Sequence, residues 1–217
     1  MKQFNMPASL LTVLFLVPIL TAACSSTGMQ RSEDVQSSMQ AVDNDIKEIV
    51  VQLDVIGASL DELIKSGQTD VKRAFDLYSY NVSEIKNMET DFAKHAGQME
   101  ESGKTYFAEW DKSGQKYDNP DIQKKSNERR AALGLIYDKI AQNNIGVKEA
   151  FRAYVSDVNE IETFLSNDLT RLGIDSISPV ANKAVNNGRL LRNELSDLQT
   201  AIEDARSEMR QLGIASN

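Results

Sequence analysis

The sequence predicts an all-α protein, an elongated antiparallel four-helix bundle with coiled-coil seams that follows a secretory leader. Apolar residues recur at alternating spacings of four and three, which is the period of a helical seam. Only 4 of the 217 residues are proline and 6% are aromatic, while Glu, Asp, Lys, Gln and Ala are abundant, a composition typical of long helices. Three short joints divide the chain into four such stretches, which favours up-down-up-down packing.

The leader covers residues 1–23. It has a positive start at Lys2, and residues 8–20 form an apolar run that is too short to span a bilayer as a helix. Small residues then directly precede Cys24, the only cysteine. The segment Leu20-Thr21-Ala22-Ala23-Cys24 resembles the lipobox of bacterial lipoproteins, with Thr21 where leucine is commonest.

The lipobox resemblance implies cleavage before Cys24 and acylation of that residue, palmitate included, which anchors the protein in a membrane. Ser25 follows, not the aspartate that retains many lipoproteins at the inner membrane. By that sorting rule we expect the periplasmic face of the bacterial outer membrane. The alternative is a secreted protein whose cysteine stays free, buried or oxidised.

Residues 24–31 are expected to form a lipidated polar tether, and residues 32–217 the helical bundle domain. The first helix is predicted to begin near Ser32 and to stop at Gly67. Its seam residues follow the four-three alternation without a miss: Val35, Met39, Val42, Ile46, Ile49, Leu53, Ile56, Leu60 and Leu63.

The second helix is predicted from Thr69 or Asp70 to about Lys116, and the third from Pro120, with Asn119 as its N-cap, to just before Gly173. Residues 172–177 are then expected to connect to a fourth helix. That helix begins with a second cap-then-proline pair, Ser178-Pro179, and closes at Gly213.

The predicted helix lengths are unequal. The first and last helices span about 35 residues, the middle two nearly 50, so the central hairpin would project by about 20 Å at residues 117–120. Alternatively, Gly97, Gly103 or Gly114 breaks the second helix and folds it back.

Charge and known motifs exclude several functions. The net charge is −8 without a basic cluster, which argues against a nucleic-acid partner and against lying flat on anionic lipid. Ser102-Gly103-Lys104-Thr105 lacks the glycine and the strand that a phosphate-binding loop needs. His95 is the only histidine, so we expect a surface or seam-edge position and no metal. No catalytic motif is present, and we expect no cofactor and no enzyme activity.

The densest aromatic group comprises Tyr106, Phe107, Trp110 and Tyr117. It either packs the end of the central hairpin or forms a docking surface for a partner, because Trp and Tyr are typical interface anchors.

Short segments resemble an uncharacterised family of bacterial domain-of-unknown-function proteins with an F-x-E-W segment. They are Phe107-Ala108-Glu109-Trp110, Tyr117-Asp118-Asn119, Ser126 with Arg129-Arg130, and residues 164–169. The family's basic stretch is weaker here, at Lys72-Arg73. The resemblance covers roughly residues 60–212 and implies a helical architecture without any catalytic residue.

These observations predict a membrane-anchored, non-enzymatic scaffold, spacer or adaptor with envelope protein partners. The alternative is a binding module that holds a lipid or other apolar ligand between the helices. The aliphatic seam of the first helix favours permanent packing, whereas Ala181, Ala184 and Gly188 leave room for either a close helix or a ligand.

Overall fold

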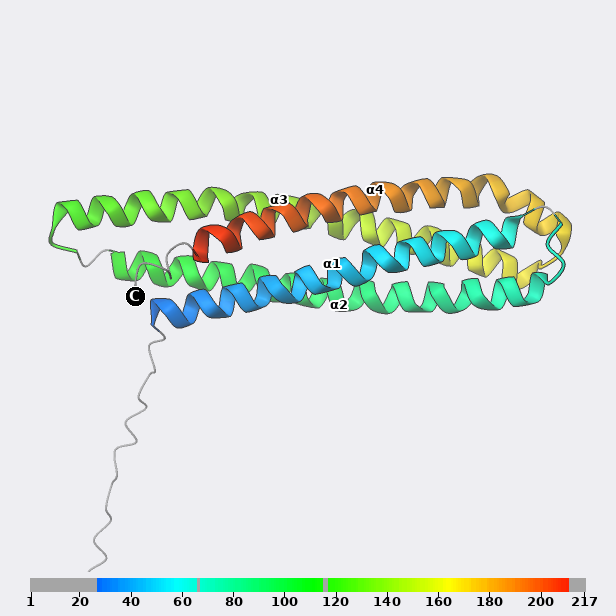
Figure 1. The fold of residues 1–217 in the computed structure, drawn as a ribbon, viewed down its shortest axis with the longest axis horizontal. Helices are drawn as coiled ribbons and strands as arrows, with labels where there is room; N and C mark the ends of the chain where they lie inside the picture. The colour runs from blue at the N-terminus through cyan, green and yellow to red at the C-terminus, as the bar shows by residue number, and fades with distance from the viewer. Residues whose placement is uncertain (1–26, 66, 115–116, 211–217) are drawn as a thin grey trace, which may run out of the picture.

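The computed structural model describes residues 27–65, 67–114 and 117–210. They form four helices that run up and down a long rod (Figure 1): α1 (Gly28–Ile64), α2 (Val71–Gly114), α3 (Pro120–Asn167) and α4 (Arg171–Arg210). α1 and α3 each pack against α2 and α4 and lie diagonally opposite one another. The predicted all-α bundle is confirmed. The leader, Cys24, Lys116 and Gly213 lie outside the described residues.

Side-chain caps set the starts of the first three helices. Thr27 precedes α1, and its hydroxyl accepts a hydrogen bond from the Gln30 N–H at 3.2 Å. Residues 28–31, expected in the tether, therefore belong to the helix. The Asp70 carboxylate caps α2 in the same way, accepting from the Arg73 N–H at 3.1 Å. The predicted Asn119-Pro120 start of α3 is confirmed, with the Asn119 side chain accepting from the Asp121 N–H at 2.9 Å.

The predicted joint between the last two helices is wrong. α3 ends at Asn167 and α4 begins at Arg171, so residues 172–177 are helical. The Thr170 hydroxyl caps the new start by accepting from the Gly173 N–H at 3.1 Å. Pro179 lies inside α4, where its missing N–H leaves one carbonyl of the preceding turn without its helical partner. The sequence predicts a break at Gly173 and a new helix start at Ser178-Pro179, but α4 runs through both positions without interruption.

The core runs the length of the described bundle. All nine predicted seam residues of α1 are buried, with at most 6% of their surface exposed. α2 passes through Gly97 and Gly103 as one helix, so the alternative in which it folds back is not adopted. Buried polar contacts also join helices: the Tyr78 hydroxyl donates to the Val158 carbonyl at 2.7 Å.

The central hairpin projects, by less than predicted. α2 and α3 have 44 and 48 residues, compared with 37 in α1 and 40 in α4. At 1.5 Å per residue the difference from α1 corresponds to about 10–17 Å. The turn between α2 and α3 extends past the start of α1 and the end of α4 (Figure 1). Among the described helices, none combines the length and apolar character of a membrane span.

Candidate functional site

The predicted aromatic group joins α2 to α3 near the projecting end of the rod. The ring of Tyr106 meets Phe107 and Trp110 edge-on, at centroid distances of 5.4 and 5.6 Å. The Trp110 Nε1–H donates to the Ser126 hydroxyl of α3 at 2.9 Å. Tyr106 is almost fully buried, whereas 43% of Tyr117 is exposed. Most of this group therefore packs the hairpin, and Tyr117 offers the largest exposed surface of the four.

A groove lies between α2 and α3 beside this cluster. It has a volume of about 510 Å³, and its lining includes Gly103, Phe107, Gly134, Tyr137 and Ile145. A Cβ atom on Gly103 would lie 2.6 Å from the Tyr137 ring, so glycine is what lets that ring approach α2. The Tyr137 hydroxyl is buried without a hydrogen-bond partner in the described structure, and burial raises its pKa. The groove therefore combines apolar walls with four charged lining residues, Glu100, Lys104, Arg130 and Asp138.

Two arginines fasten α3 to its neighbours at this end. Arg130 binds both carboxylate oxygens of Asp111, one of them at 2.7 Å, and its guanidinium lies 5.4 Å from the centre of the Phe107 ring. The hydrogen bond from Arg130 lowers the pKa of the Asp111 carboxyl. Arg129 pairs with Glu208 and donates to the Glu208 carbonyl at 2.9 Å, which ties α3 to the end of α4.

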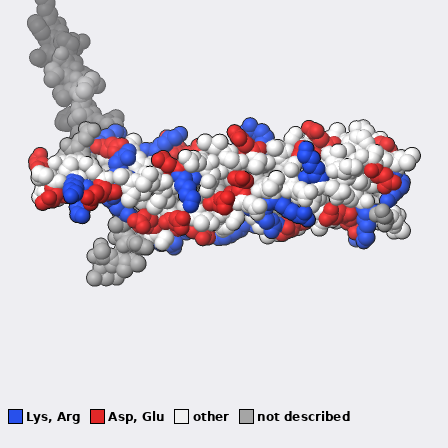
Figure 2. All heavy atoms as spheres, turned by 90° about the horizontal axis from the view of Figure 1, so that it is seen from above, with Lys and Arg blue, Asp and Glu red and all other residues white. Residues whose placement is uncertain are grey.

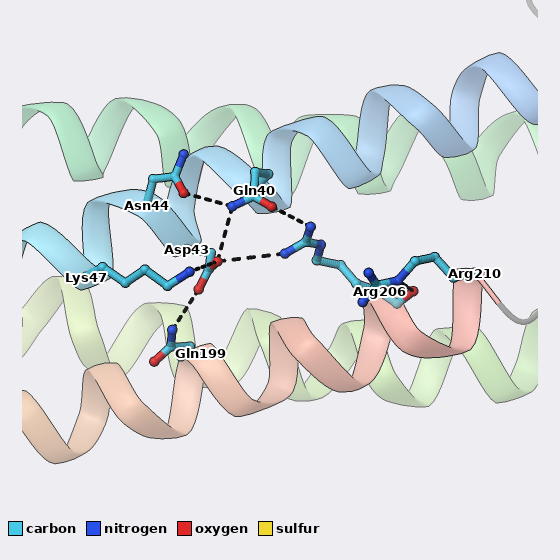
Figure 3. Close-up of polar contacts among 7 residues, drawn as sticks. All are labelled: Gln40, Asp43, Asn44, Lys47, Gln199, Arg206 and Arg210. Carbon is cyan, nitrogen blue, oxygen red and sulfur yellow. Dashed lines mark hydrogen bonds and ion pairs between the residues drawn. The ribbon is translucent and has the colours of Figure 1, made fainter.

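A buried carboxylate organises the contact between α1 and α4 (Figure 3). Only 2% of Asp43 is exposed, and it accepts hydrogen bonds from Lys47 and Gln199, both at 2.7 Å. Arg206 lies 3.8 Å away. Burial acts to raise the pKa of Asp43, but the hydrogen bonds from Lys47 and Gln199 and the nearby charges of Lys47 and Arg206 outweigh it, so the pKa is lowered.

No pattern in the sequence predicts this network as a whole. The spacing of Asp43 and Lys47 was a visible signal for one pair. Gln199 and Arg206 come from a distant part of the chain. The side-chain amide of Gln40 donates to Asp43 and accepts from Arg206, so it joins these two residues in the same hydrogen-bonded cluster. The arrangement fixes how α1 and α4 lie against one another.

His95 and the Gly103-Lys104 pair all lie within α2. His95 Nδ1 lies 2.7 Å from Asp45 Oδ2, which links α2 to α1 at the edge of the core. The described residues contain no group of three or more His, Cys, Asp or Glu side chains arranged to hold a metal ion. Gly103 and Lys104 lie inside α2, so their backbone N–H groups do not form a phosphate-binding loop.

The small residues of α4 are buried, and one of them, Gly188, packs against the ring of Tyr154. Ala181, Ala184 and Gly188 are buried, and a Cβ on Gly188 would lie 3.0 Å from the Tyr154 ring of α3. Tyr154 is itself 3% exposed. Tyr154 therefore fills the space beside Gly188, and both residues also line a groove of about 240 Å³ between α1 and α4.

Comparison with known proteins gives no assignment: a scan against family models, a search of curated proteins and a search of solved structures each found no match to this chain.

Proposed function

We propose that this protein is a lipid-anchored lipoprotein on the periplasmic face of the bacterial outer membrane, where it acts as a non-enzymatic scaffold, spacer or adaptor. One observation supports this role above the others. Gly28, four residues after Cys24, starts α1 at one end of the rod, and the α1–α2 and α3–α4 joints lie at the other end (Figure 1). With 37 residues, α1 spans about 55 Å. The rod therefore holds its far end well away from the anchor.

A spacer must be stiff, and the packing provides this property. The buried seam is continuous along α1, and polar contacts join helices at several levels, including the Asp43 network and the ion pair between Arg192 and Asp54. At the far end, the Arg171 guanidinium donates to the Lys65 carbonyl at 3.1 Å, which connects the two joints. Leu172 is 81% exposed there. We infer that envelope partners contact this far end.

Site-specific photo-crosslinking in cells tests the adaptor role. A photoreactive residue at Leu172 reports on the far end, and one at Val51, which is 62% exposed on the shaft, is the matched control. The proposal expects a discrete crosslinked envelope protein from position 172, no such product from position 51, and loss of the product in Cys24→Ser. Equal crosslinking from both positions, or crosslinking that persists without the anchor, would contradict it.

The groove beside Tyr137 favours a second candidate, the binding of an acyl chain or similar apolar ligand. A leucine at Gly134 would fill this groove, because nothing lies within 4 Å of a Cβ there. Gly97 is the matched control: its Cβ is equally unobstructed, and it does not line the groove. Native mass spectrometry should show a co-purifying lipid that Gly134→Leu removes and Gly97→Leu retains. An absence of bound lipid from the wild-type protein would exclude this candidate.

A further inference from the structure

The end of the rod that carries the anchor also carries the projecting turn of the α2–α3 hairpin. We call residues 117–125 the hairpin tip. Tyr117 lines a groove of about 250 Å³ together with Gly28, Arg31 and Trp110, so the tip lies beside the point where the chain leaves α1 toward Cys24. α3, which begins within the tip, extends beyond the start of α1 (Figure 1). Anchor and tip therefore face the same way.

The reach of the tether matches the projection of the tip. Cys24 precedes Gly28 by four residues, and an extended chain spans at most about 3.3–3.6 Å per residue, which gives roughly 14 Å. The hairpin projects past the start of α1 by about 10–17 Å, from the difference in helix lengths. If Cys24 sits at the lipid surface and the rod stands upright, even a fully extended tether brings the tip to the headgroups. A less extended tether would bring the tip closer to the lipid headgroups.

The tip has side chains suited to that position. Ile122 is 50% exposed and Tyr117 is 43% exposed, and apolar and aromatic side chains at the headgroup level are favourable contacts with a bilayer. Lys124 and Lys125 expose 74% and 82% of their side chains, and lysines at this depth keep their ammonium groups in water while their stems lie on apolar surface.

The charge distribution favours contact through the tip over contact through the side of the rod. Within the tip, Lys124 and Lys125 balance Asp118 and Asp121, whereas the whole chain has a net charge of −8. Figure 2 shows basic and acidic side chains interspersed along the face of the rod that it presents, without a basic stripe. Anionic lipid repels a surface of net negative charge and neither attracts nor repels a tip whose charges balance.

We propose that the hairpin tip rests on the lipid headgroups of the membrane in which Cys24 is anchored, so that the rod has two contacts with the bilayer and its tilt is restricted. The inference rests on the proposed lipidation of Cys24. A second protein is not needed to cover Tyr117 and Ile122, because the length of the tether already places the lipid surface within their reach.

Quenching of a site-specific fluorophore tests the proposal on the full lipidated protein. Acylation consumes the thiol of Cys24, the only cysteine, so an introduced cysteine is the sole site for labelling. The lipidated variants Ile122→Cys and Leu172→Cys are labelled with nitrobenzoxadiazole and reconstituted in vesicles of phosphatidylethanolamine and phosphatidylglycerol that contain a headgroup spin-labelled lipid. Leu172 is the matched apolar control, 81% exposed at the far end of the rod.

The proposal expects the label at position 122 to shift its emission to the blue and to be quenched, and the label at position 172 to show neither effect. If both proteins float with the vesicles and neither label is quenched, the lipid anchor is supported and the proposed contact of the tip with the headgroups is wrong. Equal quenching at both positions would also overturn it, because the rod would then lie flat. If neither protein floats with the vesicles, the lipid anchor itself fails, and the inference fails with it.

Discussion

A Cβ atom on Gly173 would lie 2.3 Å from the carbonyl oxygen of Asp168, so the α3–α4 joint closes in this way only around glycine. The contact is with backbone, and relief requires the joint itself to move. We expect Gly173→Ala to lower the free energy of unfolding by about 1–3 kcal/mol, the usual cost of forcing extra atoms into a packed site.

Gly97→Ala is the control for that substitution. Nothing lies within 4 Å of a Cβ at Gly97, and alanine favours a helix interior by about 0.5–1 kcal/mol over glycine. Urea unfolding followed by circular dichroism should therefore show opposite signs for the two variants. If Gly173→Ala were as stable as Gly97→Ala, the α3–α4 joint would not bring the Asp168 carbonyl oxygen this close to Gly173.

The long predicted elements were correct because their evidence is repeated many times. The seam of α1 has nine residues at alternating spacings of four and three, and no single residue decides it. The last joint was misplaced because it depended on single residues with more than one use: Gly173 permits a close backbone contact, and Pro179 is accommodated within a helix.

The candidate sites were less predictable than the fold. Gln199, which donates to Asp43, lies 156 residues away in the sequence, and no local pattern pairs the two. The groove beside Tyr137 depends on how α2 and α3 are rotated against one another. Periodicity identifies the face of a helix that is buried, and the partner of each residue on that face follows only from the three-dimensional packing.

Protonation of Asp43 should make the protein less stable in acid. Its pKa is lowered in the folded state, so its contribution is present above the unfolded value near 3.8 and is lost as the pH falls through the lower folded value. We expect the free energy of unfolding to decrease below about pH 4. Asp43→Asn should be less stable at neutral pH and should show a smaller acid-dependent loss, as measured by urea unfolding at several pH values.

The control for Asp43 is Asp54→Asn. The pKa of Asp54 is also lowered, by its hydrogen bond from Arg192, but its side chain is 70% exposed. Solvent and salt screen such a pair, and its contribution to stability is small. If Asp54→Asn reduced the acid-dependent loss of stability more than Asp43→Asn does, the role assigned to the buried Asp43 network would be contradicted.

Removal of a seam residue should cost more than removal of the tryptophan. Ile46 is 1% exposed in the middle of α1, and Ile46→Ala should lower the free energy of unfolding by about 2–5 kcal/mol. Trp110 is half-buried in the hairpin, so we expect Trp110→Ala to cost less. Chemical denaturation of both variants measures the difference. If Trp110→Ala proves the more damaging, the aromatic cluster is the main core of the protein.

The predicted lipid anchor at Cys24 supports both the proposed function and the contact of the hairpin tip with the membrane. The most direct test is the intact mass of the protein extracted from bacterial outer membranes with detergent. We predict a chain that begins at Cys24 and carries a diacylglyceryl group together with a further acyl chain such as palmitate. A chain that begins at another residue, or one whose Cys24 has a free thiol, would contradict the account.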